Sequence, residues 1–311
     1  MKPAQRENLA QLGTEQPNRA STDLDRKPSL QIARIINAED AKVARAVKRA
    51  LPQIARAIDC VAEALGRGGR LIYVGAGTSG RIAALDAAEC PPTFNTNREM
   101  VQFIIAGGPK ALGTAVEANE DSRELGRREI ARKRPTRKDV VIGIAASGRT
   151  PFTVAAIQYA RRHGAHTVAI TCNRKTPLEK AAHLAIVTEV GPEILAGSSR
   201  MKAATAQKMV LNMISTGAMT RLGYVYGNLM VNVHPRNSKL RQRALEIIRQ
   251  ITGRNGEAAA RILKAAGSVP AAIVMDQAAV TRSEAERALN ATGGNVRRAI
   301  SRARQRLNES A

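Results

Sequence analysis

The stretch that decides the fold is Leu71–Gly80, which reads LIYVGAGTSG. Its first four residues are apolar or aromatic, as in a strand that is buried on both faces. Glycines and hydroxyl residues follow, and a helical pattern begins at Arg81. A strand, a glycine-rich turn and a helix form the first unit of a doubly wound α/β domain. The turn also presents backbone N–H groups at a helix N-terminus, where anions bind.

Further apolar runs repeat this pattern along the chain: Val101–Ala106, Val140–Ala145, Thr167–Thr171 and Leu184–Val187. Each run is apolar throughout rather than alternating, which is typical of a parallel sheet covered on both faces. Helical stretches separate the runs: Arg81–Ala88, Asp121–Lys133, Thr150–His163 and Thr176–Ala182. We therefore predict an α/β fold with a doubly wound, five-stranded parallel sheet.

The chain divides by pattern into three parts. Residues 1–66 are predicted to be an N-terminal tail and helices that pack on the core, and 67–238 the α/β domain. Residues 239–311 are strand-free by pattern and are predicted to be a helical C-terminal module. This module contains a near-repeat, because Ile262–Gly267 resembles Ala288–Gly293, and each copy predicts a helix that stops at glycine.

The composition is unusual in its charge. Of 311 residues, 49 are Lys or Arg and 26 are Asp or Glu, a net charge of +23. Such a charge favours anionic partners, namely nucleic acids, membrane surfaces or acidic metabolites. Aromatic residues, which stack on bases, make up only 2% of the chain. The basic runs at 123–138 and 297–306 show no helix-turn-helix pattern, so we do not expect specific nucleic-acid binding.

Other classes of protein are excluded by simpler signals. No apolar run approaches the ~20 residues of a membrane span, and residues 1–19 hold no hydrophobic signal sequence. Cys60, Cys90 and Cys172 are widely scattered, which predicts reduced thiols in a cytoplasmic protein. The four histidines lack metal-ligand spacing, so we expect no metal.

Loops rich in glycine and hydroxyl residues predict a phosphate site. Such a loop follows the first and the third apolar run, and a third loop opens a long helix from about Met201 to Leu222. The candidate phosphate-binding residues are Thr78, Ser79, Ser147, Arg149, Thr150, Ser198, Ser199 and Lys202. Helix capping by serine and threonine is the alternative interpretation of each loop. Loops at the carboxyl ends of parallel strands converge, however, which favours one site for a phosphorylated small molecule. No acidic residue ends the second strand, which argues against a dinucleotide.

The glycine–serine loops resemble the sugar isomerase (SIS) phosphosugar-binding domain. Longer motifs are similar to the N-acetylmuramic acid 6-phosphate etherase family, from LDAAECPPT at 85–93 through EANEDS at 117–122 to the stretches 143–151 and 197–208. This resemblance implies cleavage of the lactyl ether of N-acetylmuramic acid 6-phosphate to N-acetylglucosamine 6-phosphate and D-lactate, in cell-wall amino-sugar recycling. It also implies a homodimer.

The chemistry of this reaction requires a positioned acid and base. Once the sugar ring opens, the C1 aldehyde acidifies the C2 proton, and the lactyl oxygen on C3 can leave by elimination. Two carboxyl groups are enough for these steps, so we expect no cofactor. The resemblance makes Glu89 the proton donor and Glu120 the second catalytic carboxylate.

Local patterns agree with these roles. Glu89 is expected near the end of a helix that Pro91 and Pro92 terminate, and the electronegative helix end favours a protonated carboxyl. Asp121 and Glu124 form a predicted capping box, which leaves Glu120 free for chemistry. Asp86 is either a supporting residue or a surface residue. Arg81 and Arg200 are the candidates to bind the lactyl carboxylate, whereas His234 is left out of the site.

Two alternative functions stay open. The first is a non-catalytic phosphosugar regulator, similar to the glucokinase regulatory protein. The second, less favoured, is an SIS-type DNA-binding regulator, which the net charge of +23 suggests. The presence of both Glu89 and Glu120 favours the enzyme.

Overall fold

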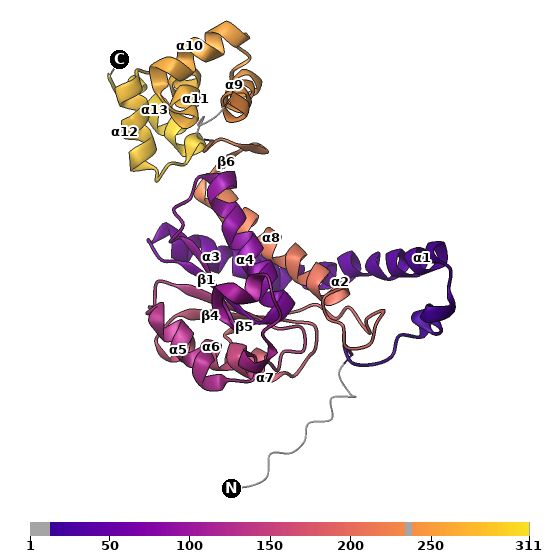
Figure 1. Ribbon diagram of the computed structural model, residues 1–311. Helices are drawn as coiled ribbons and strands as arrows, with labels where there is room; N and C mark the ends of the chain where they lie inside the picture. Colours follow the sequence, from indigo (N-terminus) through magenta and orange to yellow (C-terminus); the bar gives the residue numbers. More distant parts are fainter. Residues whose placement is uncertain (1–12, 234–237, 311) are drawn as a thin grey trace. The chain divides into compact units, whose positions relative to one another are not determined.

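The computed structural model describes residues 13–233 and 238–310 (Figure 1). The chain forms two compact units. The first comprises residues up to Ala87 together with Glu99–Ser215, and the second comprises Ala88–Arg98 with the residues from Thr216 onward. The chain division at residues 66 and 238 stays a prediction.

A five-stranded parallel sheet is the centre of the first unit, as the sequence predicts. Its strands lie in the order β2 (Val101–Ile105), β1 (Leu71–Gly75), β3 (Val140–Ile144), β4 (His166–Thr171) and β5 (Leu184–Val187). The register pairs Leu71 with both Val101 and Val140. Every residue of β1 and β3 is buried, which explains why these runs are apolar without alternation.

Helices cover both faces of this sheet (Figure 1). On one face lie α5 (Arg123–Arg132), α6 (Pro151–Arg162) and α7 (Pro177–Ala181). Side chains of α5 and α6 share a core with Ile72 and Val74 of β1. The other face carries α3 (Leu51–Gly66) and α4 (Gly77–Phe94). There Tyr73 of β1 donates a hydrogen bond to Asp86 of α4 at 2.8 Å.

Two local predictions about the helices are wrong. Pro91 and Pro92 do not end α4, which continues to Phe94. Both prolines lie in its last turn and lack the amide hydrogens that would donate to the carbonyls four positions earlier, and α4 ends soon after them. The cap of α5 is Ser122, whose hydroxyl accepts from the Leu125 amide at 3.1 Å, and not Asp121.

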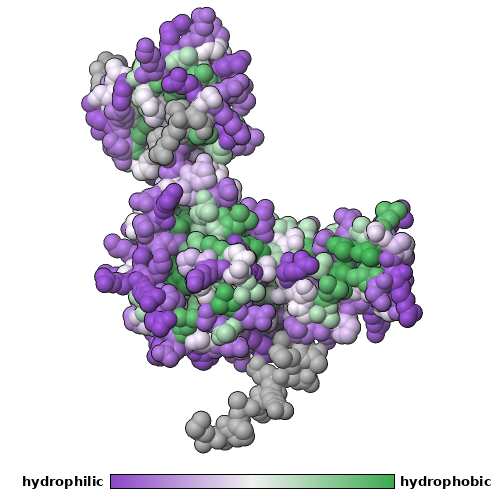
Figure 2. Space-filling model, viewed as in Figure 1, coloured by the Kyte–Doolittle hydropathy of each residue, from purple (hydrophilic) through white to green (hydrophobic). Residues whose placement is uncertain are grey.

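The N-terminal part of the first unit consists of short turns and an extended arm. Helix α1 (Ser29–Asp40) projects from the sheet, and α2 (Val43–Arg49) leads back to it (Figure 1). Glu39 is the only residue of α1 that is buried. Figure 2 shows hydrophobic surface on this arm. The arm is therefore held mainly at its C-terminal end.

The second unit is helical apart from one small hairpin. Strands β6 (Val225–Tyr226) and β7 (Leu229–Met230) form the hairpin, and α8 (Lys202–Leu222) leads into it. Five helices follow: α9 (Ser238–Thr252), α10 (Gly256–Ala266), α11 (Val269–Ala278), α12 (Arg282–Ala291) and α13 (Val296–Ser310). They have a hydrophobic core of their own. Both copies of the near-repeat form a helix, a turn with a glycine at positive φ and a second helix.

No single helix among the described residues is both long and apolar enough to cross a membrane. Only α10 and α11 taken together pass by length and composition, and they are bent by 110°.

Candidate active site

A pocket of about 570 Å³ lies at the carboxyl edge of the sheet. Residues that follow β1, β2 and β3 line it, together with parts of the N-terminal segment and of the loop before α8. The lining residues with polar side chains are Glu15, Thr78, Ser79, Arg81, Glu117, Glu120, Asp121, Ser147, Thr150 and Ser199. The converging loops therefore form one site, with residues from distant parts of the chain.

The loop after β1 brings backbone close to the pocket. A Cβ atom on Gly80 would lie 2.5 Å from Cγ1 of Ile105, so only glycine allows α4 to start this close to β2. Thr78 and Ser79 lie in the first turn of α4, whose amides have no acceptor within the helix. The Ser79 hydroxyl also donates to Oε1 of Gln207 at 2.9 Å. The first turn can therefore offer its N–H groups and the Thr78 hydroxyl to an anion, while the proton of the Ser79 hydroxyl is used by Gln207.

The loop after β3 contributes a second helix N-terminus. Gly148 has φ +68, and a Cβ there would lie 2.5 Å from the Thr176 hydroxyl. This turn places Ser147 and Thr150 in the pocket wall, at the start of α6. Arg149 does not line the pocket, although its amide donates to the Ser147 hydroxyl at 3.2 Å.

The loop before α8 is only partly in the site. Ser199 and Gly197 line the pocket, whereas Ser198 and Arg200 do not. Lys202 is 1% exposed, and its ammonium donates to Oε2 of Glu39 at 2.7 Å. The structure thus directs the Lys202 side chain to α1 and away from the predicted phosphate site.

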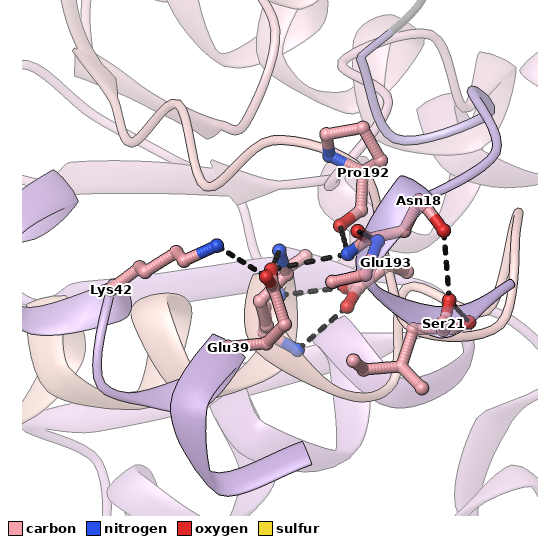
Figure 3. A network of polar contacts seen from close by, with 10 residues as sticks. Asn18, Ser21, Glu39, Lys42, Pro192 and Glu193 are labelled. Atoms are coloured by element: carbon pink, nitrogen blue, oxygen red, sulfur yellow. Dashed lines mark hydrogen bonds and ion pairs between the residues drawn. The ribbon is translucent and has the colours of Figure 1, made fainter. Parts of the chain in front are cut away.

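Lys202 belongs to a buried polar network (Figure 3). Besides Lys202, Glu39 accepts hydrogen bonds from Lys42 and from Asn18. Burial alone would raise the pKa of Glu39, but the hydrogen bonds from Lys202, Lys42 and Asn18 lower that pKa to about 2. Glu193 caps α8 by accepting from the amides of Lys202 and Ala203, both at 2.9 Å. The network ties α1 and the N-terminal segment to the start of α8.

Glu120 lies inside the pocket. Its carbonyl accepts from the Phe152 amide at 3.0 Å, which fixes its backbone to the first turn of α6. Its Oε1 atom would lie 3.0 Å from a Cβ on Gly77, a glycine with φ +51. Burial raises the pKa of Glu120, the charges of Glu117 and Asp121 add to this, and Arg81 opposes it. A carboxyl with a raised pKa beside an anion-binding loop is suited to proton transfer.

Glu89 lies elsewhere on the chain. It is exposed and does not line the pocket. It lies on α4 more than three helical turns beyond Gly77, a distance of ~18 Å along the helix axis. The structure of one chain therefore does not bring the two predicted catalytic carboxyls together.

The pocket contains acidic residues that the sequence did not single out. They are Glu15, Glu117 and Asp121. The sequence signal for Glu117 and Asp121 was the EANEDS motif at 117–122.

Asp86 and His234 were not assigned to the site from the sequence. Asp86 is buried and accepts from Tyr73 and Ser215, so it supports the packing of α4. His234 is outside the described residues. Within residues 13–233 and 238–310, His, Cys, Asp and Glu form no group that could hold a metal ion.

Comparison with known proteins places this site in context. A family model described as the glucokinase regulatory protein N-terminal SIS domain matches residues 53–161, and the SIS domain model matches residues 133–216. The N-acetylmuramic acid 6-phosphate etherase of Symbiobacterium thermophilum is 55% identical over 86% of this chain and 89% of its own length. That of Streptomyces coelicolor is 49% identical over 97% of both chains.

Among solved structures, a phosphoheptose isomerase from Francisella tularensis matches with a TM-score of 0.49 and 18% identity. The match covers 62% of this chain and all of the isomerase.

Proposed function

The chain belongs to the N-acetylmuramic acid 6-phosphate etherase family, and we propose that the pocket at the carboxyl edge of its sheet is the active site. The chain is thus a carbon–oxygen lyase of cell-wall amino-sugar recycling. It cleaves the lactyl ether of N-acetylmuramic acid 6-phosphate to give N-acetylglucosamine 6-phosphate and D-lactate. The observation that carries the assignment of the site is Glu120, a carboxyl with a raised pKa between two anion-binding helix N-termini.

The phosphate is proposed to bind at the N-termini of α4 and α6. The hydroxyls of Thr78, Ser79, Ser147 and Thr150 all line this part of the pocket. Backbone N–H groups and helix dipoles favour a doubly charged phosphate there. Ser199 reaches the same pocket from a third loop. Arg149, Ser198 and Lys202 do not line it, so we leave them out of the proposed phosphate site.

The proposed reaction is an elimination followed by hydration. With the sugar ring open, a base takes the C2 proton, the C3–O bond breaks and an acid protonates the departing lactate oxygen. Water then adds across the new double bond, with hydroxyl at C3 and a proton at C2. Glu120 and Glu89 share the acid and base roles, with Glu89 as proton donor.

The position of Glu89 supports a homodimer. A carboxyl ~18 Å along α4 from Gly77 cannot reach a substrate held at that glycine in its own chain. We therefore infer that Glu89 of a second copy completes each pocket. We also propose that this dimer is cytoplasmic. Such sharing requires the same surface of both copies to meet around a two-fold axis.

A regulator that binds a phosphosugar without turnover is the second candidate function. The match of residues 53–161 to the glucokinase regulatory protein domain favours it. Glu120 weighs against it, because a carboxyl with a raised pKa at the pocket wall serves proton transfer, whereas binding a phosphate does not require one.

An assay of D-lactate release distinguishes these two functions. We expect the purified chain to release D-lactate from N-acetylmuramic acid 6-phosphate. The variant Glu120→Ala should lower kcat by about 10²- to 10⁴-fold, as for the loss of a general acid or base. The control Glu124→Ala changes an exposed carboxyl outside the pocket and should keep full activity. Binding of substrate without lactate release by the wild type would show that the chain is a regulator.

A further inference from the structure

Glu15 is a pocket carboxylate that the proposed reaction does not use. It is half-buried and comes from the N-terminal segment, far in sequence from the other pocket residues. Its neighbour Thr14 is 2% exposed, and the Thr14 hydroxyl accepts from Nδ2 of Asn173 at 3.3 Å. The same Nδ2 donates to the carbonyl of Ala146 at 3.0 Å. The segment is therefore fixed to the loops that follow β3 and β4.

A second set of contacts fixes this segment to the loop before α8. The amide of Gly197 donates to the carbonyl of Thr14 at 3.2 Å. Gly197 has φ +77, and a Cβ there would lie 3.0 Å from Oε2 of Glu15. A few residues on, Asn18 donates to Glu39 and to the carbonyl of Pro192 (Figure 3). The Glu15 carboxylate therefore lies close to Gly197. Hydrogen bonds fix the backbone of its segment to the loop before α8 and to the loops that follow β3 and β4.

The chemistry of the pocket limits what Glu15 can bind. A carboxylate accepts hydrogen bonds and donates none. Among the described residues that line the pocket, Arg81 is the only basic one, and its guanidinium donates to the carbonyls of Ala111 and Thr114 at 2.9 Å each. A carboxylate placed beside the phosphate or the lactyl carboxylate of the substrate would repel it. The groups that suit Glu15 are the neutral donors of an amino sugar, its hydroxyls and its acetamido N–H.

We propose that Glu15 is a specificity-determining residue that accepts a hydrogen bond from a neutral donor of the sugar. The proposal rests on the proposed function, since it takes the same pocket as the phosphosugar site. A hydrogen bond to a charged acceptor is among the stronger ones in proteins. Its loss should weaken binding of a sugar phosphate by about 10- to 100-fold.

Binding measured by calorimetry tests this proposal without requiring turnover. The probes are N-acetylglucosamine 6-phosphate, glucose 6-phosphate and inorganic phosphate, and the variants are Glu15→Gln and Glu15→Ala. Gln16→Ala is the matched control, because Gln16 is exposed on the same segment and does not line the pocket. We expect Glu15→Ala to bind N-acetylglucosamine 6-phosphate about 10- to 100-fold more weakly, with phosphate binding and the control unchanged. Glu15→Gln keeps an amide oxygen that accepts the hydrogen bond and should lose less affinity, because only the charge is removed.

Glucose 6-phosphate identifies the donor group. If its affinity is unchanged in the Glu15 variants, the donor is the acetamido N–H. If its affinity falls as much, the donor is a hydroxyl. The proposal is overturned if the affinities for both sugar phosphates are unchanged in the Glu15 variants. It is also overturned if these affinities rise because a repulsive charge has been removed.

Kinetics separate a failure of this inference from a failure of the proposed function. Lactate release by the wild type establishes the function independently of any Glu15 variant. With that established, Glu15→Ala should raise KM and leave kcat within a few-fold, since the lost contact is made in both ground state and transition state. A kcat that falls 100-fold at unchanged KM would instead make Glu15 a catalytic residue and contradict the proposed role.

Discussion

The surroundings of Glu120 fix its position and raise its pKa. Its backbone is fixed by the hydrogen bond to Phe152, while its carboxyl lies in a pocket with Glu117 and Asp121 nearby. Burial and these like charges raise its pKa, so the native state holds the proton more tightly than the unfolded chain does. A group of this kind destabilises the fold as the pH rises, because ionising it costs more in the native state.

This reasoning predicts that Glu120→Gln stabilises the protein at neutral pH. The folded pKa is raised, so the cost appears as the pH climbs above the unfolded value of about 4.3 and is complete above the folded pKa. We expect the variant to melt ~1–2 °C above the wild type at pH 7. Differential scanning calorimetry at pH 4 and pH 7 measures this, and the difference should be smaller at pH 4. A variant that melts below the wild type at pH 7 would show that Glu120 has a structural role.

Individual residues also show where sequence reasoning succeeds. Thr78, Ser79, Ser147 and Thr150 were predicted to lie together because each follows a buried parallel strand, and the register of a sheet brings such positions to one edge. Lys202 is the first residue of the helix that follows such a loop. Whether a lysine there faces the pocket or the core depends on Glu39, which is distant in sequence. No local pattern signals that ion pair.

At the scale of elements, the position at which helix α8 starts is fixed by the hydrogen bonds of its first turn. Glu193 accepts the amides of Lys202 and Ala203, and Lys202 reaches back to Glu39 at the end of α1. The start of α5 could be predicted only approximately, since Ser122 and Asp121 are both good caps and the choice between them depends on how the preceding turn approaches. The last residue of α4 could not be predicted from its prolines, because a proline weakens a helix without fixing the residue at which it ends.

The buried pair of Lys202 and Glu39 predicts a double-variant effect. Lys202→Met leaves the Glu39 carboxylate buried without its main cation, which should lower the free energy of unfolding by about 3 kcal/mol. Adding Glu39→Gln removes the buried charge and should recover more than half of that loss. Urea unfolding of the two variants measures both values. Equal losses in the single and the double variant would show that Lys202 acts by packing alone.

The whole molecule carries a net charge of +23, yet its proposed active site is rich in carboxylates. The proposed phosphate site consists of helix N-termini and hydroxyls rather than of lysines and arginines. The charge excess can attract an anionic substrate over a distance, and the pocket then selects it at short range. Net charge is thus a poor guide to the residues of a site, because it reports on the surface and not on what converging loops enclose.

The proposed catalytic carboxyls, Glu120 and Glu89, are expected to meet only between two copies of the chain. In one chain Glu120 lines the pocket, and Glu89 is exposed on α4 outside it. If each site takes Glu120 from one copy and Glu89 from the other, two inactive variants complement each other. A hybrid dimer of Glu89→Ala with Glu120→Ala has one site with both glutamates and one site with neither.

Hybrid dimers with two different affinity tags test this arrangement by their lactate release. The hybrid of Glu89→Ala and Glu120→Ala should have about half of the wild-type kcat, although each variant alone is inactive. The control hybrid pairs the wild type with the double variant Glu89→Ala/Glu120→Ala and should be inactive, because both of its sites then lack one glutamate. If each chain instead used its own two glutamates, the first hybrid would be inactive and the control would keep about half of the activity. The two hybrids thus give opposite results for shared and unshared sites, with the same number of substitutions in each dimer.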